Sequence, residues 1–249
     1  MRFVMFLSAA VDSYFWPGRY RLLDYIYTAF HQASVDGTPV LQPFWFRYPK
    51  DPNTFGIDLQ FFYGDSILIS PVTQENATSV TFYLPNDIFY DFKTLKPTQG
   101  HGSNVTLDNV DLTQIPVYIK GGAILPLRMQ STMTTNELRK QDFEIVVAPD
   151  ASGEAYGELY YDDGESIEPA SSSFVKFWFK DRALMMAGEF GYPLGVNLAR
   201  VRVLGVDRAP GEVYLDGEVV KFLYDSSTMV LDVGVGRVFD REFEVCFGD

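Results

Sequence analysis

The sequence predicts a mainly β protein in which one helix and a strand are followed by two consecutive antiparallel β-sandwich domains. Three observations predict this fold. One long stretch has helical periodicity, short apolar and aromatic runs follow it at regular intervals, and Gly, Pro, Asn and Asp separate those runs. The chain has 249 residues, of which 47% are hydrophobic and 16% aromatic. We therefore expect one large or two modest folded domains rather than a disordered chain.

Residues 19–36 predict the helix. Apolar side chains recur along it at three- and four-residue spacing: Leu22, Leu23, Ile26 and Phe30. Gly37 and Pro39 follow directly and predict its end. Asp24 interrupts the apolar stripe, and we expect its carboxylate to face solvent.

The first group of predicted strands lies between the helix and a polar, non-periodic linker at residues 131–141. Its members are 39–48, 66–72, 79–85, 88–92 and 115–127. Pro43 argues against a central strand at 39–48, because proline cannot donate to a sheet ladder. Gly121 and Gly122 predict a tight turn inside the last run.

The second group of predicted strands follows the linker. Its members are 143–149, 155–163, 174–179, 199–206, 212–217, 228–234 and 243–247. Asp216 and Gly217 predict a two-residue hairpin turn. The two groups are the reason for predicting two sandwiches.

The charge and the cysteine content exclude several classes of function. The formal net charge is −13, so we expect no nucleic-acid partner and no attraction to an anionic membrane. No apolar run reaches the roughly 20 residues that span a bilayer. Cys246 is the single cysteine, so an internal disulfide and a thiolate metal site are both excluded. We predict no cofactor and no metal site.

Two Asn-x-Thr sequons, at Asn76 and Asn104, are candidate glycosylation sites. They favour a secreted protein or one of the secretory pathway. Residues 1–13 contain one basic residue and a short apolar stretch, as a stunted signal peptide does. A start inside a longer gene is the favoured interpretation of these residues.

The stretch "ELYYDDGES" at residues 158–166 places four carboxylates beside two tyrosines and a glycine. Three interpretations stay open: a solvated acidic hairpin turn, a calcium site and a catalytic carboxylate pair of the kind that glycosidases use. The turn is favoured, because Asp-Gly is a strong hairpin signal and the spacing does not fit an EF-hand loop. Tyr160 and Tyr161 should point to opposite faces of a strand.

Five blocks of the sequence resemble glycoside hydrolase family 31, the α-glucosidases and their relatives. They appear in the family's order and spacing over residues 19–166: "RYRLLDYIYT", "DLQFFYGDSILISPV", "FYLPNDIFYDF", "IPVYIKGGAILPL" and "GELYYDDGES". The remainder, from about residue 170, resembles the family only in being rich in strands.

The resemblance implies a domain organisation. Family members carry a (β/α)8 barrel followed by proximal and distal C-terminal β-sandwiches. The chain would then comprise a remnant of the end of the barrel at 1–65, with its last helix and strand, a proximal sandwich at 66–138 and a distal sandwich at 139–249. Residues 1–60 would expose apolar side chains without the rest of the barrel. We therefore expect a chain starting near Asp65 to be the more soluble one.

The resemblance also implies that the catalytic residues are absent. Family members are retaining enzymes whose Asp nucleophile and Asp acid/base lie on earlier barrel strands, and nothing in this sequence matches those motifs. His31 and His101 match no family site. We therefore assign no catalytic and no substrate-binding residue, and expect the chain to be inactive alone, because retention needs two carboxyl groups about 5–5.5 Å apart.

Three functions remain open. The leading one is the C-terminal part of an α-glucosidase-like hydrolase of O-glycosyl bonds, whose intact form acts on an α-glucan or a maltooligosaccharide. A second is a processed subunit that associates with the catalytic barrel as a separate chain. A third is a non-catalytic β-sandwich that binds α-glucan. The substrate stays open among those of α-glucosidases, α-xylosidases, lyases and transglycosylases.

Overall fold

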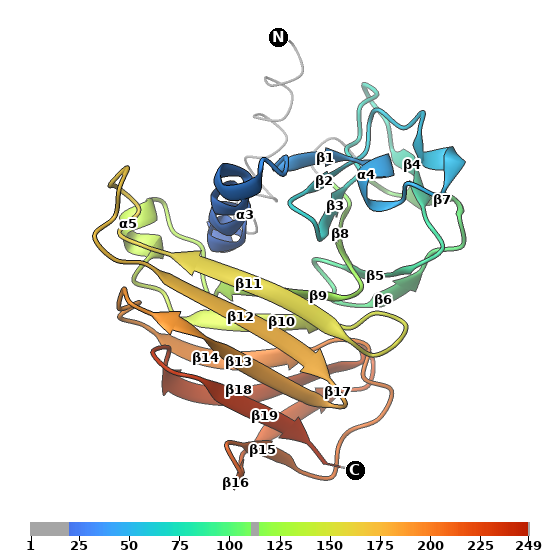
Figure 1. The fold of residues 1–249 in the computed structure, drawn as a ribbon. Helices are drawn as coiled ribbons and strands as arrows, with labels where there is room; N and C mark the ends of the chain where they lie inside the picture. The colour runs from blue at the N-terminus through green and yellow to red at the C-terminus, as the bar shows by residue number, and fades with distance from the viewer. Residues whose placement is uncertain (1–19, 111–114, 249) are drawn as a thin grey trace.

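The structure is a computed structural model, and it describes residues 20–110 and 115–248. The signal-like segment at 1–13 lies outside the described residues, as does the first part of the predicted barrel remnant at 1–65. The described chain is mainly β, with multiple sheets, as the sequence predicts (Figure 1).

The predicted helix is confirmed as α3 (Leu23–Asp36). It ends at Gly37, whose φ of 80° is left-handed and whose N–H donates to the carbonyl of Ala33. Three short helical segments complete the set in the described residues: α4 (Phe44–Arg47), η1 (Pro52–Thr54) and α5 (Thr135–Leu138). The prediction of a strand over 39–48 is wrong beyond Pro43, where α4 replaces it.

A six-stranded antiparallel sheet and a separate two-stranded ribbon form the upper part of the molecule in Figure 1. The order in the sheet is β1-β2-β3-β8-β5-β6, and β4 pairs with β7 in the ribbon. The bounds are β1 (Leu41–Pro43), β2 (Phe61–Tyr63), β3 (Ile67–Ile69), β4 (Ser79–Leu84), β5 (Ile88–Asp91), β6 (Pro97–Gln99), β7 (Ser103–Asp108) and β8 (Val117–Lys120).

The lower part is one eleven-stranded sheet that curls around its own core. Its order is β16-β15-β19-β13-β12-β11-β9-β10-β14-β18-β17, antiparallel except at the pairs β9–β11 and β10–β14. The bounds are β9 (Ala123–Arg128), β10 (Phe143–Ala148), β11 (Ala155–Tyr161), β12 (Ser173–Lys180), β13 (Ala183–Phe190), β14 (Asn197–Val203), β15 (Val213–Leu215), β16 (Glu218–Val219), β17 (Phe222–Asp225), β18 (Val230–Val238) and β19 (Phe243–Phe247).

Three apolar cores lie within and between these layers. One fills the curled eleven-stranded sheet, with Phe143, Phe177 and Phe239 at its centre. A second, which contains Phe62 and Phe82, lies between the six-stranded sheet and the ribbon. A third contains side chains of α3, the six-stranded sheet, β9 and β10. The layers are thus joined by burial of apolar area, the main driving force for packing.

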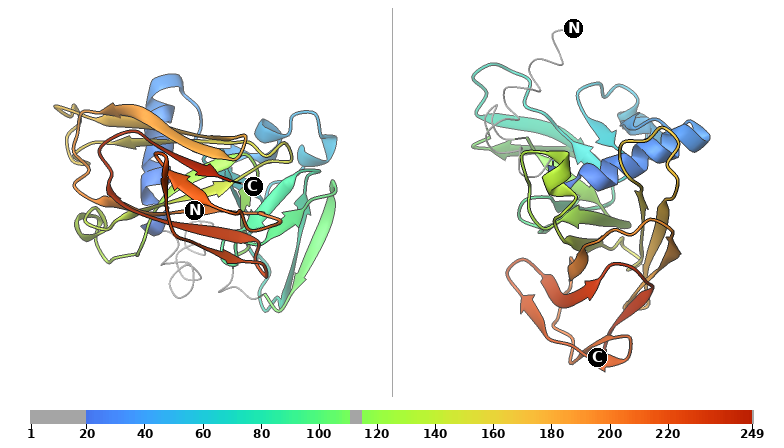
Figure 2. Two further views of the ribbon diagram at one scale, coloured as in Figure 1. Left: turned by 90° about the horizontal axis from the view of Figure 1, so that it is seen from below. Right: turned by 90° about the vertical axis from the view of Figure 1, so that its left-hand side faces the viewer.

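Helix α3 packs beside β9 and β11, which are in the middle of the strand order of the eleven-stranded sheet (Figures 1 and 2). Hydrogen bonding crosses both predicted domain boundaries: β2 pairs with β3 across 65/66, and β9 pairs with β10 across 138/139. The boundaries themselves stay predictions. The predicted linker at 131–141 contains α5, whose Thr134 hydroxyl accepts from the N–H of Glu137.

Two predicted turns are confirmed. Gly122, with φ of 89°, lies in the turn between β8 and β9. Asp216 and Gly217, with φ of 49° and 81°, connect β15 to β16 in the manner of a two-residue hairpin. The turn predicted at residues 158–166 is longer than a hairpin turn: β11 ends at Tyr161, and its partner β12 begins at Ser173.

Candidate functional site

The four carboxylates of residues 158–166 differ in their surroundings. Asp162 is buried, at 3% exposed, and accepts hydrogen bonds from the Tyr27 hydroxyl at 2.9 and 3.0 Å and from the Gly164 N–H at 2.8 Å. Its backbone carbonyl accepts from the Arg139 guanidinium. The prediction of a solvated turn is therefore wrong for Asp162, which ties the loop to α3.

The other three carboxylates of this stretch are the solvated ones. Asp163 accepts from the N–H groups of Glu165 and Ser166 and from the Ser166 hydroxyl, which lowers the pKa of Asp163 to about 2. Glu158 on β11 accepts from the Tyr156 hydroxyl, and Glu165 is exposed. Asp163 and Glu158 are thus ordered by the loop and by the strand, as a structural turn requires.

Tyr160 and Tyr161 point to opposite faces of β11, as predicted. Tyr161 is 2% exposed in the core of the curled sheet. Tyr160 lies on the other face, where the ring of His31 stacks on it with a centroid distance of 3.6 Å. Burial lowers the pKa of His31. His31 is thus a packing residue between α3 and β11.

Asp24 faces Arg128 rather than solvent, so the expectation from the helical pattern is wrong. Its carboxylate accepts from Arg128 Nε at 2.7 Å and Nη2 at 3.0 Å, and the arginine is fully buried. Burial lowers the pKa of Arg128, but the charge and hydrogen bonds of Asp24 outweigh it, so the pKa is raised overall. The guanidinium also lies 3.8 Å from the ring centroid of Phe143.

A second buried carboxylate, Glu144 on β10, lies among three arginines. Arg21 and Arg200 each contact one of its oxygens, the latter at 2.7 Å, and Arg202 approaches at 3.4 Å. Asp232 accepts from the same two β14 arginines at 3.3 Å. These contacts order the Glu144 side chain and join β10, β14 and β18.

Neither ion cluster has the composition of a metal site. Among residues 20–110 and 115–248, no three His, Cys, Asp or Glu side chains gather so that they could hold a metal ion. In the same part of the chain, no helix is long and apolar enough to cross a membrane.

The predicted glycosylation candidates both lie on the surface. Asn76 is exposed in the loop between β3 and β4, with a φ of 58°. Asn104 is exposed on β7, opposite Tyr83. Both asparagines are accessible to solvent, as a glycan requires.

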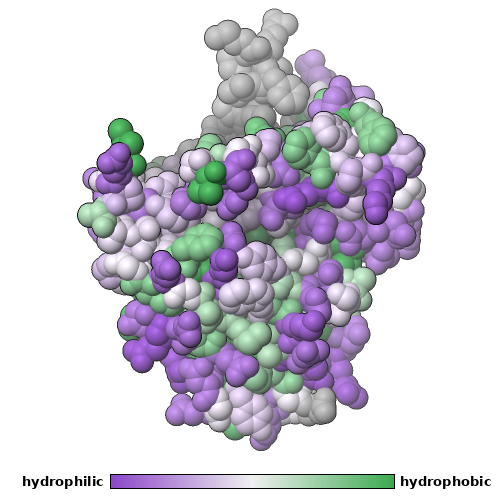
Figure 3. All heavy atoms as spheres, viewed as in Figure 1, coloured by the Kyte–Doolittle hydropathy of each residue, from purple (hydrophilic) through white to green (hydrophobic). Residues whose placement is uncertain are grey.

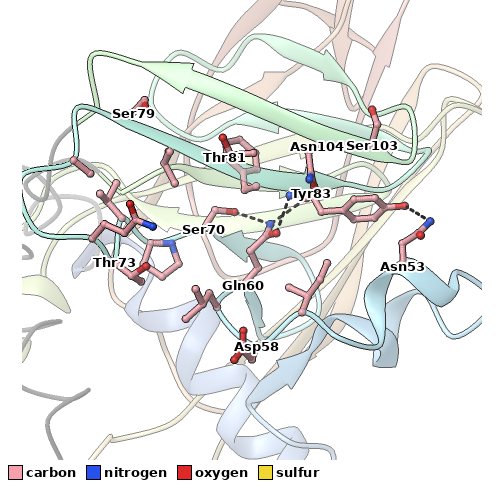
Figure 4. A pocket seen from close by; sticks show the side chains of 18 of the residues that line it. Asn53, Asp58, Gln60, Ser70, Thr73, Ser79, Thr81, Tyr83, Ser103 and Asn104 are labelled. Carbon is pink, nitrogen blue, oxygen red and sulfur yellow. Dashed lines mark hydrogen bonds between the residues drawn. The ribbon is translucent and has the colours of Figure 1, made fainter.

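An open groove of about 750 Å³ runs along the outer edge of β4 (Figure 4). Its floor contains Gln60, whose side-chain amide binds both backbone groups of Tyr83: Oε1 accepts from the N–H at 2.8 Å and Nε2 donates to the carbonyl at 3.0 Å. Nε2 also donates to Ser70 Oγ at 3.0 Å. The groove is lined mostly by hydroxyl, amide and small apolar groups, with Asn104 at its rim.

Sequence reasoning did not single out this groove. Its lining comes from four separated segments, around 57–60, 70–74, 79–83 and 102–104, whose proximity depends on the pairing of β4 with β7. One signal was available: Gln60 is a lone amide beside the apolar residues of β2. A buried amide in such a place must bind a backbone group.

Six exposed large hydrophobic side chains lie in α3, β1 and α4 or directly after η1. We call this set the α3–η1 surface, and its members are Phe30, Val35, Leu41, Trp45, Phe46 and Phe55. Green side chains reach the surface over this upper part of the molecule in Figure 3. A second group of exposed apolar side chains lies on neighbouring strands of the eleven-stranded sheet: Tyr156, Trp178 and Met185.

The comparison with protein families agrees with the resemblance found in the sequence. Residues 37–125 match the model of the glycosyl hydrolase family 31 C-terminal domain. That match covers all strands from β1 to β8 and the start of β9.

Curated relatives extend the similarity beyond that domain. A probable alpha/beta-glucosidase, agdC, of Aspergillus fumigatus is 53% identical over 187 residues, which are 75% of this chain and 21% of the relative. Glucoamylase 1 of Candida albicans is 37% identical over 88% of this chain and 24% of its own length. The chain therefore spans about a fifth to a quarter of the length of these relatives.

Solved structures share the fold over most of the chain. A glucosidase II alpha subunit bound to DNJ has a TM-score of 0.81 and 28% identity, covering 92% of this chain and 28% of that subunit. The catalytic subunit in a heterodimeric complex of ER glucosidase II with the binding domain of its regulatory subunit has a TM-score of 0.78 and 27% identity. The chain belongs to glycoside hydrolase family 31 and corresponds to the C-terminal part of its α-glucosidase-like enzymes.

Proposed function

We propose that this chain is a non-catalytic structural portion of an α-glucosidase-like hydrolase and is inactive alone. In the intact enzyme it covers the catalytic (β/α)8 barrel, which hydrolyses O-glycosyl bonds of an α-glucan or maltooligosaccharide with retention. The names of the fungal relatives, an alpha/beta-glucosidase and a glucoamylase, support a glucoside substrate.

The observation that carries this proposal is the α3–η1 surface. Its side chains are 44–68% exposed, although several are aromatic. Apolar patches of this kind mark interaction sites in proteins that are otherwise well packed. Helix α3 is fixed by Asp24 to Arg128, by Tyr25 to Tyr63 and by Tyr27 to Asp162. It therefore presents its exposed apolar side chains in a fixed orientation.

The proposed occupant of the α3–η1 surface is the catalytic barrel of the enzyme. It is supplied either by the same polypeptide or by a separate chain after processing. A regulatory subunit of the kind seen in the glucosidase II complex is a further partner that the family likeness supports. Both arrangements bury the surface and explain why its side chains are apolar.

Association is the direct test. The chain is mixed with the separately expressed part of the Aspergillus fumigatus relative that precedes the matched region, and binding is measured by light scattering and interferometry. The double variant Trp45→Ser/Phe46→Ser should weaken binding more than about tenfold, because buried aromatic side chains dominate interfaces. The matched control, Met185→Ser/Leu223→Ser, changes two exposed apolar side chains elsewhere and should leave binding unchanged. Equal binding by both variants would contradict the proposed surface.

We also propose that the protein enters the secretory pathway and carries glycans at Asn76 and Asn104. The exposure of both sequons supports this. In a secreting yeast host, mass spectrometry should find two glycans, and Asn76→Gln and Asn104→Gln should each remove one. A secreted product with unmodified asparagines would refute it.

A further inference from the structure

We propose that the groove along the outer edge of β4 is a binding site for a neutral saccharide. The groove is the one of about 750 Å³ in Figure 4, a volume in the range of small-molecule sites. This inference does not depend on association with a barrel, because it rests on residues of this chain alone.

The charge of the lining selects a neutral ligand. The chain carries 33 acidic and 20 basic residues, yet among the described residues that line the groove Asp58 is the one charged side chain. A phosphate or carboxylate ligand would meet no cation there, and a cationic ligand would meet a single carboxylate. Hydroxyl and amide groups, which both donate and accept, are the partners that neutral polyols require.

The floor of the groove is fixed before any ligand binds. Gln60 is held by three hydrogen bonds of 2.8–3.0 Å to Tyr83 and Ser70. The Tyr83 hydroxyl in turn donates to Asp51 Oδ2 at 2.5 Å. A rigid site loses little conformational entropy on binding, which matters for ligands as weakly bound as sugars.

The outer edge of β4 offers unused backbone groups. In an antiparallel ribbon, alternate residues direct both backbone groups to the same edge. Since Tyr83 directs its groups to Gln60, Thr81 and Ser79 direct theirs to the groove. No described residue bonds to these groups across the groove. Ser79 and Thr81 therefore each offer one backbone donor and one backbone acceptor to a ligand in the groove.

The remaining lining complements a sugar better than a peptide strand. A peptide that adds to a sheet edge uses pockets for its alternate side chains. Here the wall opposite β4 carries the exposed polar side chains of Thr73 and Gln74 and the 44%-exposed Leu59. Polar groups suit sugar hydroxyls, and Leu59 suits the apolar C–H face of a pyranose ring.

Two sources supply this chemistry: a free oligosaccharide, or the inner sugars of a glycan on Asn104, which lies in the rim of the groove. They are distinguished with unglycosylated full-length chain made in bacteria. Maltotriose represents a free α-glucan, and N,N′-diacetylchitobiose represents the inner sugars of an N-glycan. Each is titrated to about 10 mM, well above the millimolar Kd range, while amide NMR signals are followed.

The backbone amide of Thr81 and the side-chain amide of Gln74 should shift with one of the two saccharides. Thr81→Val keeps the backbone groups but removes the hydroxyl that Thr81 adds to the groove lining, so it should weaken binding about 2- to 10-fold, as expected for one lost hydrogen bond. Thr106→Val is the matched control. It removes the same 2.8 Å hydroxyl–hydroxyl contact between Thr81 and Thr106, but Thr106 does not line the groove.

Shifts with maltotriose alone identify a free α-glucan, and shifts with chitobiose alone identify the glycan core; both support the proposal. No shift of these amides with either sugar overturns it. Equal weakening by Thr81→Val and Thr106→Val also overturns it. An extended polythreonine peptide is titrated as a third ligand, and shifts with this peptide alone would show a site for a peptide strand and overturn the proposal as well.

Discussion

The region around α3 and the curled eleven-stranded sheet are stabilised in different ways. The curled sheet closes around its own apolar core, and its strands pair with neighbours over most of their length. Helix α3 packs Tyr25 and Ile26 into the third apolar core, and it is also held by polar contacts between residues far apart in sequence, such as Asp24 with Arg128 and Tyr27 with Asp162. One region completes its own core, whereas the other buries one side and leaves apolar side chains exposed on the other.

This difference indicates which part of the molecule depends on a partner. A sheet with a closed core needs no further surface to fold. A helix whose outward side is apolar does not reach its lowest free energy until that side is covered. Changes near α3 should therefore act through buried polar contacts as well as packing, and changes in the curled sheet mainly through packing.

The largest expected effect comes from Arg128. Arg128→Met leaves the Asp24 carboxylate buried without its partner and should lower the free energy of unfolding by about 3–5 kcal/mol. Urea denaturation followed by circular dichroism measures it. Arg200→Met is the control, because Glu144 keeps Arg21 and Arg202 and the loss should be smaller. Equal losses would show that the Asp24–Arg128 pair has no special role.

Leu184, on β13, tests the packing of the curled sheet. It is fully buried in the core, and Leu184→Ala should lower the free energy of unfolding by about 2–5 kcal/mol through lost burial and a new cavity. The same denaturation measurement applies. Leu223→Ala on β17, where the side chain is 78% exposed, should change stability by less than about 0.5 kcal/mol. A large effect of the exposed leucine would mean that this face is covered in solution.

The sequence predicted the strands that are rich in apolar and β-branched residues, but not those at exposed positions. β7 was missed because its residues are polar and at least partly exposed, so no apolar alternation marks it. β13 was missed because Gly188 and Glu189 break its pattern at the exposed end. Local patterns predict a strand only where one of its faces is buried.

The polar contacts could not be predicted, because their partners are distant in sequence. Asp24 reads as a solvated interruption of a helix until Arg128, 104 residues away, is placed beside it. The groove along β4 has the same origin, since it needs Gln60, next to the six-stranded sheet, to bind Tyr83 in the separate ribbon. The greater solubility expected of a chain that starts near Asp65 stays a prediction. Removal of α3 would also have a cost, because it would leave Arg128 buried without its carboxylate partner.

The smallest expected effect is a pH dependence at Asp163. Its folded-state pKa of about 2 lies below the roughly 3.9 of an unfolded aspartate, so its hydrogen bonds stabilise the fold above about pH 4 and are lost as the pH falls toward 2. Asp163→Asn should lower the Tm slightly at pH 6, and the difference from the wild type should vanish near pH 2. A difference that is independent of pH would show that the hydrogen bonds of this carboxylate do not contribute.

The central claim is that this chain supplies no catalytic pair and supports an active site formed by another part of the enzyme. The most direct measurement is turnover of p-nitrophenyl α-glucoside and maltose by the purified chain, alone and after mixing with the preceding part of the Aspergillus fumigatus relative. The account predicts no hydrolysis by the chain alone and higher activity in the mixture than in the preceding part by itself. Robust hydrolysis by the chain alone would contradict it.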